Sequence, residues 1–256
     1  MGLREFVATL GQQEATVAVV DRESKRPVYR LLVDLFDTDA VEVRDVEGET
    51  GSDLTNTTVL RKGGAHEDIA VSSLGAVRDE LLLVNSDIYV TGARGLDDID
   101  PPEVVAGLDE VPFQVSDRSR QPKAKLVLIE MSRAIEAMAW RDGTGRLDAG
   151  FQHLSRLTDE RGTERVYTRL GSDTDVETRV YGVSGGDPSL PPVTVCAGDT
   201  RELRRSWFVA YQPEDRPADG AALVAYRTDD AVWEGCWTYD PDSIAAVLDY
   251  LDGAYA

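Results

Sequence analysis

The sequence predicts an α+β protein made of two modules, in which helices and strands are mixed along the chain. Segments before residue 118 follow the order helix, strand, helix, strand, strand, helix, which is typical of a small α/β module. Segments after residue 119 predict a mostly antiparallel sheet flanked by helices. A loop-rich interval over residues 85–121, rich in glycine and proline, lies between them. We therefore expect an N-terminal module over residues 1–118 and a second module over residues 119–256.

The N-terminal elements are predicted from the spacing of apolar residues. The first helix has its apolar residues at positions 3, 6, 7 and 10, and Gly11 ends it. β-Branched runs and one alternating segment indicate the strands. The expected elements are a helix over 3–10, a strand over 15–20, a helix over 27–36, strands over 41–46 and 57–60, and a helix over 73–83.

The C-terminal module begins with a long helix from residue 121, which Asp142 and Gly143 are expected to end because glycine readily adopts a left-handed C-cap. Residues 206–211 and 221–226 are apolar on both faces, which is typical of central strands. Asp240 is expected to cap a final helix. The other expected elements are a helix over 164–170 and strands over 176–183, 193–197 and 233–239.

The chain is strongly acidic, with 47 Asp and Glu residues against 27 Lys and Arg residues and only four lysines. The acidic residues are spread along the chain. This distribution favours a protein adapted to a high-salt cytoplasm, where salt screens charge repulsion, over an acidic surface for one basic partner. The charge also argues against nucleic-acid binding, which needs a basic patch.

Residue usage near the N-terminus and at the cysteines points to a cytoplasmic protein. Arginine and glutamate lie in the first helical turn, so no signal peptide is expected, and no apolar stretch approaches the length of a membrane span. Cys196 and Cys236 lie in apolar runs without the close spacing of a metal site, and we expect buried free thiols. No cofactor is identified by the sequence.

A second stripe on the long helix contains Arg133, Glu136 and Trp140, at spacing i, i+3 and i+7. One interpretation is a salt-bridged solvent face with the tryptophan at the edge of a core. The other is a recognition surface for an anionic or planar ligand. We favour the first, in which Arg133→Ala would cost under about 1 kcal/mol.

Large aromatic side chains beside small residues suggest a ligand pocket in the C-terminal module. Gly150 and Gly235 are expected to leave space beside them, and Arg133, Gln152 or Arg205 would supply a polar contact. For any single ring we favour the alternative, in which the ring simply fills the core and Trp237→Ala would cost roughly 3–5 kcal/mol. The aromatic residues concerned are Phe151, Trp207, Trp237 and Tyr239.

The sequence offers little support for catalysis or metal binding. His66 lies in a polar loop and His153 follows Phe151 and Gln152, and no Gly-x-Ser-x-Gly motif accompanies either. Thiols and imidazoles are scattered, and the Asp-rich stretches lack a calcium-loop pattern. We therefore expect a protein that is not an enzyme, with no metal site.

Three ordered motifs resemble the DICT sensory domain. They are SRAIEAMAWRDGTGRLDAGFQHLS over 132–155, RRSWFVAY over 204–211 and WEGCWTYDPDSI over 233–244, and the resemblance covers about residues 119–254. It implies a cytoplasmic α+β sensory domain that detects an input and passes it to signalling machinery. The N-terminal module resembles the segment that precedes this domain in stand-alone proteins of salt-adapted archaea. Cys236 departs from the pattern, where an aromatic residue is expected, and this departure is expected to open or reshape the wall beside Trp237.

The leading hypothesis is therefore a non-enzymatic sensory protein that senses a small ligand. Relatives in this family are often fused to cyclase, phosphodiesterase or kinase modules, and no such module is recognisable here. A signal would then be passed to a separate signalling protein. An interaction adaptor without a small-molecule ligand is the alternative, and an unrecognised hydrolase or transferase is a third possibility.

Overall fold

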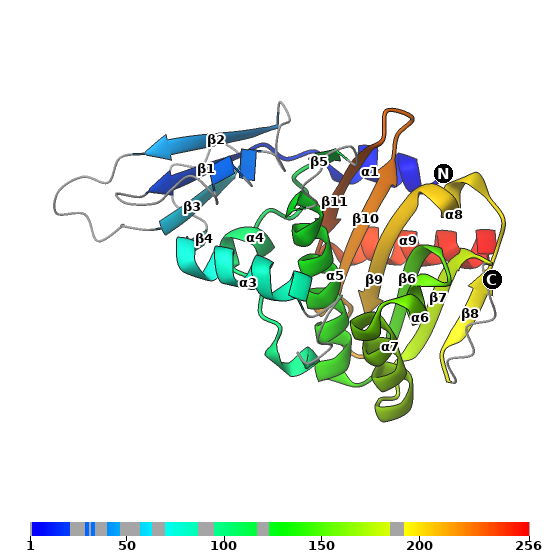
Figure 1. The fold of residues 1–256 in the computed structure, drawn as a ribbon. Helices are drawn as coiled ribbons and strands as arrows, with labels where there is room; N and C mark the ends of the chain where they lie inside the picture. The colour runs from blue at the N-terminus through cyan, green and yellow to red at the C-terminus, as the bar shows by residue number, and fades with distance from the viewer. Residues whose placement is uncertain are drawn as a thin grey trace.

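The computed structural model describes residues 2–20, 29–30, 32–33, 40–46, 57–62, 70–86, 95–116, 123–184 and 192–255. Figure 1 shows two mixed sheets with helices packed between and around them. This arrangement confirms the predicted α+β class. The helix expected over residues 27–36 lies largely outside the described residues, as does His66.

The smaller sheet has four strands in the order β2 (Val41–Val46), β1 (Ala15–Val20), β3 (Thr57–Lys62) and β4 (Ala70–Ser73). Strand β1 is parallel to β2 and antiparallel to β3, and β3 is antiparallel to β4. Helix α3 (Leu74–Ser86), which was predicted over residues 73–83, follows β4 directly and packs on α5 (Lys123–Asp142). Strand β4 was not expected from the sequence.

The larger sheet has seven strands, and its neighbouring pairs are antiparallel except for two parallel pairs at one edge, within the described residues. Strands β6, β7 and β8 form this parallel edge. The predicted central strands β9 and β10 are indeed central. In spatial order the strands are β5 (Phe113–Ser116), β11 (Val232–Thr238), β10 (Ala221–Arg227), β9 (Ser206–Gln212), β6 (Arg146–His153), β7 (Glu177–Val183) and β8 (Thr194–Ala197).

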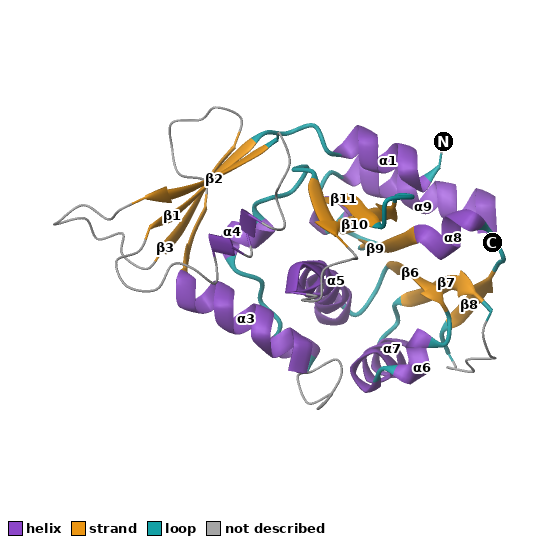
Figure 2. Ribbon diagram, turned by 45° about the horizontal axis from the view of Figure 1, so that its top comes forward, coloured by secondary structure: helices purple, strands orange, loops and turns teal. Residues whose placement is uncertain are grey.

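Helices cover both faces of the seven-stranded sheet (Figure 2). Helices α5 and α7 (Arg161–Asp173) lie on one face, and α1 (Leu3–Leu10) and α9 (Pro241–Tyr255) lie on the other. Short elements complete the chain: 3-10 turns η2 (Leu96–Asp98) and η3 (Pro217–Asp219), and helices α4 (Glu103–Ala106), α6 (Arg156–Asp159) and α8 (Arg201–Arg205).

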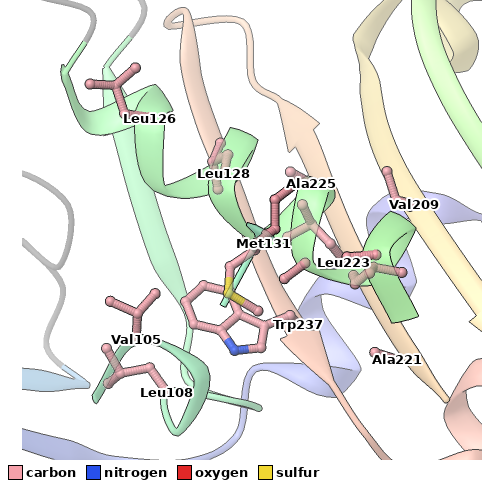
Figure 3. Packing of buried hydrophobic residues seen from close by; sticks show 14 of the residues in the cluster. Val105, Leu108, Leu126, Leu128, Met131, Val209, Ala221, Leu223, Ala225 and Trp237 are labelled. Carbon is pink, nitrogen blue, oxygen red and sulfur yellow. The ribbon is translucent and has the colours of Figure 1, made fainter. Parts of the chain in front are cut away.

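Each face of this sheet has its own hydrophobic core. Trp237 lies in the core beneath α5, with Met131, Leu223 and Leu108 around it (Figure 3). Cys236 points to the opposite core, beneath α1 and α9. Cys236 therefore does not shape the wall beside Trp237, which corrects the expectation raised by its departure from the family pattern.

Two elements from the N-terminal side of residue 118 belong to the larger sheet and its covering layer. Strand β5 pairs with β11, so that Phe113 lies 5.9 Å, ring centre to ring centre, from Trp237. Helix α1 contributes Leu3 and Phe6 to the core with α9. The two sheets thus do not correspond one to one with the modules expected on either side of residue 118.

Local sequence signals explain how the central helix ends and the last helix begins. Gly143 and Gly145 have φ of +71° and +96°, and α5 ends at Asp142, directly before Gly143, as the sequence predicted. A Cβ at Gly145 would lie 2.5 Å from the carbonyl oxygen of Gln212. The Asp240 carboxylate accepts a 2.8 Å hydrogen bond from the Ser243 amide, which confirms the predicted N-cap of α9.

Candidate functional site

The helical stripe of α5 is buried and does not face solvent. Arg133 is 5% exposed and Glu136 is 3% exposed, and their side chains form an ion pair with a 2.5 Å N–O distance. The solvent-face interpretation is therefore wrong. Helix α5 packs on the sheet and also on α3 and α7, so its apolar stripe and its polar stripe are both covered by other elements.

A hydrogen-bonded network joins this ion pair to α7. The guanidinium of Arg133 donates to the Thr163 hydroxyl at 2.9 Å, and the Tyr167 hydroxyl donates to Glu136 at 2.8 Å. Burial, together with the negative charge of Glu136, holds the pKa of Tyr167 well above its ordinary value. Tyr167 is therefore a permanent donor, and the ring of Phe151 packs edge-on against it at 5.2 Å.

Trp140 connects α5 to two neighbouring segments. Its indole N–H donates to the Asp97 carboxylate of η2 at 2.8 Å. The guanidinium of Arg169, from α7, lies 4.1 Å from the centre of the indole ring, which is cation–π geometry. These contacts occupy both the ring face and the N–H, so Trp140 holds segments together.

The tryptophans of the expected aromatic pocket are packed against protein atoms. Trp207 donates to the Ser132 hydroxyl at 3.0 Å, and its ring meets Trp233 edge-on at 6.1 Å. Trp237 is 1% exposed and donates to the Ala106 carbonyl at 3.2 Å. These contacts support the core-packing alternative for both side chains.

The space expected beside the two glycines is filled by aromatic rings. A Cβ at Gly150 would lie 2.3 Å from the ring of Phe208, and one at Gly235 would lie 2.5 Å from the ring of Phe113. The expectation of open space beside these glycines is therefore wrong. Small residues in these strands allow close approach of a neighbouring ring.

The remaining predicted site residues lie apart from the α5–α7 network. Arg205, at the end of α8, pairs with the Asp229 carboxylate at 2.5 Å on the surface. Tyr239 follows β11 and is half-buried, and burial, with a smaller effect of Asp109, raises its pKa to about 12. The structure thus brings together Arg133, Glu136, Phe151 and Trp140 around α5 and α7, whereas it separates Arg205, Trp237 and Tyr239 from them.

An open pocket of about 490 Å³ lies at the carboxyl ends of the three parallel strands. Strand β6 ends at His153, β7 at Val183 and β8 at Ala197. Parallel strands present their carboxyl ends at one edge of a sheet, and this edge is where open α/β sheets commonly bind ligands. The pocket is lined by His153, Val183, Ser184, Ala197, Gly198, Asp199 and Arg204.

A strained bulge in β6 forms one side of this pocket. Gln152 has φ of +25°, although it is not glycine, and the pairing of β6 with β7 shifts between Gly150 and His153. The Gln152 amide donates to the Ser206 carbonyl at 2.6 Å and accepts from Arg156 at 2.6 Å. These bonds hold a conformation that costs energy, and such strain is commonly found at functional sites.

The ionisable groups of the pocket lie near solvent. Arg204 pairs with the Asp199 carboxylate, and their side chains are 44% and 76% exposed. His153 and Ser184 are exposed as well. His153 was considered from its sequence context, but its neighbours in the pocket were not. These residues lie at or just beyond the ends of three separate strands, and only the parallel pairing of β6, β7 and β8 brings them together.

A second polar network lies on the face of the sheet opposite to α5 and α7, and it joins α9 to the parallel strands. Asp148 is fully buried and accepts two hydrogen bonds from Arg146, at 2.9 and 2.6 Å, and one from the Tyr181 hydroxyl at 2.8 Å. Arg146 also bonds Asp252 of α9 at 2.7 Å, and Arg179 bonds the same carboxylate at 2.5 Å. The hydrogen bond from Arg146 is the main cause of the lowered pKa of Asp252.

Further observations concern metals, membranes and thiols. In the part of the chain that the structure describes, no group of three or more His, Cys, Asp or Glu side chains is placed to hold a metal ion. No helix among the described residues is long and apolar enough to cross a bilayer. Cys196 and Cys236 are free thiols, with Cys236 buried, as expected, and Cys196 half-buried.

Comparison with known proteins gives no family assignment. No family model and no curated protein matches the chain. Among solved structures, a polyphosphate kinase from Porphyromonas gingivalis aligns at 8% sequence identity with a TM-score of 0.34. The alignment covers 98% of this chain and 47% of that one, so this chain spans less than half the length of the kinase. A TM-score this low does not indicate a shared fold.

Proposed function

We propose that this protein is a cytoplasmic, non-enzymatic sensory protein that binds a small ligand in the pocket at the ends of β6, β7 and β8. The ligand's presence would be reported to a separate signalling protein, as the resemblance to the DICT domain implies. The observation that carries this proposal is the open pocket at the parallel edge, bordered by the strained bulge at Gln152.

The bulge offers a physical route from the pocket to the helices. His153 lines the pocket, Gln152 is the strained residue, and Phe151 packs on Tyr167 of α7. Tyr167 in turn bonds Glu136 of α5. A ligand that relaxes or tightens the bulge would shift Phe151 and so change the packing of α7 on α5, because packed interiors respond to small displacements by changing between discrete arrangements.

An adaptor without a small-molecule ligand is the alternative proposal. Val46 and Val71 are large apolar side chains that are exposed, and they lie on β2 and β4, the two edge strands of the four-stranded sheet. Exposed edge strands can pair with another chain. This alternative places the functional surface on the other sheet, far along the chain from the strand-end pocket.

Native mass spectrometry of protein purified from the organism that encodes it would test the proposal. We expect a reproducible added mass that disappears on denaturation. The variant that tests the site is Ser184→Trp. Ser184 is exposed and lines the pocket, so a large side chain there should fill the pocket without disturbing a core. An added mass retained by this variant would contradict the proposed site, and a co-purifying polypeptide without a small molecule would favour the adaptor.

A further inference from the structure

The pocket differs in charge from the chain around it. The chain has 47 acidic against 27 basic residues, whereas the pocket is lined by one carboxylate, Asp199, one guanidinium, Arg204, and one imidazole, His153. A surface with an acidic excess repels anions and attracts cations over its whole area. The pocket instead presents one fixed charge of each sign, side by side.

The two fixed charges are paired with each other and only loosely held. Arg204 lies in α8 and Asp199 precedes that helix, and their side chains are joined by an ion pair. The Asp199 side chain is mostly exposed and that of Arg204 is partly exposed, so water screens their attraction and the pair is weak. Such a pair is readily exchanged for stronger partners, and the planar guanidinium is suited to bind a carboxylate through two parallel hydrogen bonds.

A ligand carrying a single charge would satisfy one partner and oppose the other. An anion on Arg204 would displace Asp199 and lie close to its negative charge, and a cation on Asp199 would lie close to Arg204. A ligand with both charges gives each side chain a partner of opposite charge, since its carboxylate faces Arg204 and its ammonium group faces Asp199. Val183 and Ala197 provide an apolar surface beside these groups.

We propose that the ligand of this pocket is a small zwitterion with one carboxylate and one ammonium group, of the α-amino acid type. The inference rests on the proposed ligand-binding function and deepens it. Arg204 binds the carboxylate, Asp199 binds the ammonium group, and His153 and Ser184 contact the remainder of the ligand from the ends of β6 and β7.

Thermal-shift and calorimetric titrations with the twenty common α-amino acids test this inference on the full chain. We expect at least one to stabilise the wild type and to have no effect on Ser184→Trp. For that amino acid, the analogue lacking the amino group and the analogue lacking the carboxylate should each bind roughly tenfold or more weakly, the effect of losing one good polar partner. With leucine these analogues are 4-methylpentanoate and 3-methylbutylamine.

Two pocket variants and one matched control assign the charges. Asp199→Asn should abolish the preference for the amino acid over its deaminated analogue, and Arg204→Gln should abolish the preference over its decarboxylated analogue. The control is Arg201→Gln, because Arg201 lies on the same helix but pairs with Asp229 outside the pocket. It should bind as the wild type does.

The inference is overturned if none of the twenty amino acids binds, or if an analogue with one charge binds as tightly as its parent. The proposed function is tested separately by the mass of the co-purified ligand. A neutral or singly charged co-purified ligand that Ser184→Trp fails to retain would leave the sensory function supported and the zwitterion excluded. Retention of any ligand by Ser184→Trp would instead exclude the pocket itself.

Discussion

The buried network between α5 and α7 and the pocket at the ends of β6, β7 and β8 differ in how much room they leave for a ligand. Between α5 and α7, Arg133 and Glu136 are buried and their polar atoms are bonded to each other and to Thr163 and Tyr167. At the strand ends, Asp199 and Arg204 face solvent in an open pocket. The first region is a packed core and the second is an accessible pocket. Most of the candidate ligand-binding residues predicted from the sequence nevertheless lie in or near the first region.

This contrast shows that the type of residue does not decide its role here, because the charge pair Arg133–Glu136 is buried whereas the charge pair Arg204–Asp199 lies at the surface. Buried ion pairs must be fully bonded to be tolerated, and that requirement fills the space around them. Substitutions should therefore have large effects on stability in the first region and small effects in the second.

The largest effect is expected for Trp237→Ala. Trp237 is almost fully buried and contacts Phe113 and the Ala106 carbonyl, so its truncation should lower the free energy of unfolding by about 3–5 kcal/mol. Chemical denaturation measures this change. A cost below about 1 kcal/mol, the range of surface substitutions, would show that the core beneath α5 is misplaced.

Arg133→Ala should have a similar effect, about 3–5 kcal/mol, because it leaves the buried Glu136 without its counter-charge. This value replaces the cost of under about 1 kcal/mol that a solvent-exposed stripe would give. Arg161→Ala, an exposed position on α7, is the matched control and should have little effect. Equal, small losses for both variants would mean that the α5–α7 network is solvated.

Gly150→Ala should cost less, about 1–3 kcal/mol, because the added methyl group overpacks a strand whose neighbour cannot move freely. Its Cβ would lie 2.3 Å from the Phe208 ring. Gly253→Ala is the control, since no atom lies within 4 Å of the position that its Cβ would take. Thermal unfolding of both variants would show whether the space beside Gly150 is truly filled.

The Asp252 ion pairs should contribute at most about 1 kcal/mol, because the carboxylate is 41% exposed. Arg146 lowers the pKa of Asp252 in the folded state, so this stability is present above the ordinary aspartate pKa and is lost as the pH falls through the lowered value. The difference between wild type and Asp252→Asn should therefore be seen at pH 7 and shrink below about pH 4. A difference that grows on acidification would have the wrong sign.

The smallest effect on stability is expected for His153→Ala. His153 is exposed at the end of β6, and surface substitutions of this kind usually change the free energy of unfolding by less than about 0.5 kcal/mol. The same variant should weaken ligand binding, which separates stability from function at this position. A large loss of stability would mean that His153 is packed in the protein interior. The pocket would then not differ from the α5–α7 network in accessibility, which would contradict the account.

Much of the fold was predictable because apolar periodicity depends on neighbours in the sequence. Helices α1 and α9 and strands β1, β9 and β10 follow such patterns and were predicted with bounds within a residue or two, apart from the C-terminal end of α9, which was left open. Strands β4 and β5 are short and were missed, because pairing with a distant strand decides their conformation. Helix α8 was missed for a related reason, since five residues carry little periodicity.

The candidate site was less predictable than the fold. Trp237 was correctly considered as a core residue, but the burial of Arg133 depends on α7 packing over α5, which no local pattern encodes. Similarly, Val183 and Asp199 become neighbours only through the parallel register of β7 and β8. Long-range pairing, and not residue type, decides which side chains share a pocket.

Ligand retention by two variants tests the central claim most directly, that a ligand occupies the strand-end pocket and not the α5–α7 cluster. Native mass spectrometry would compare Ser184→Trp, which fills the pocket, with Phe151→Leu, which alters the aromatic contact to Tyr167. We predict that the bound mass is lost from Ser184→Trp and kept by Phe151→Leu. Loss from Phe151→Leu with retention by Ser184→Trp would contradict the account and return the binding site to the aromatic cluster.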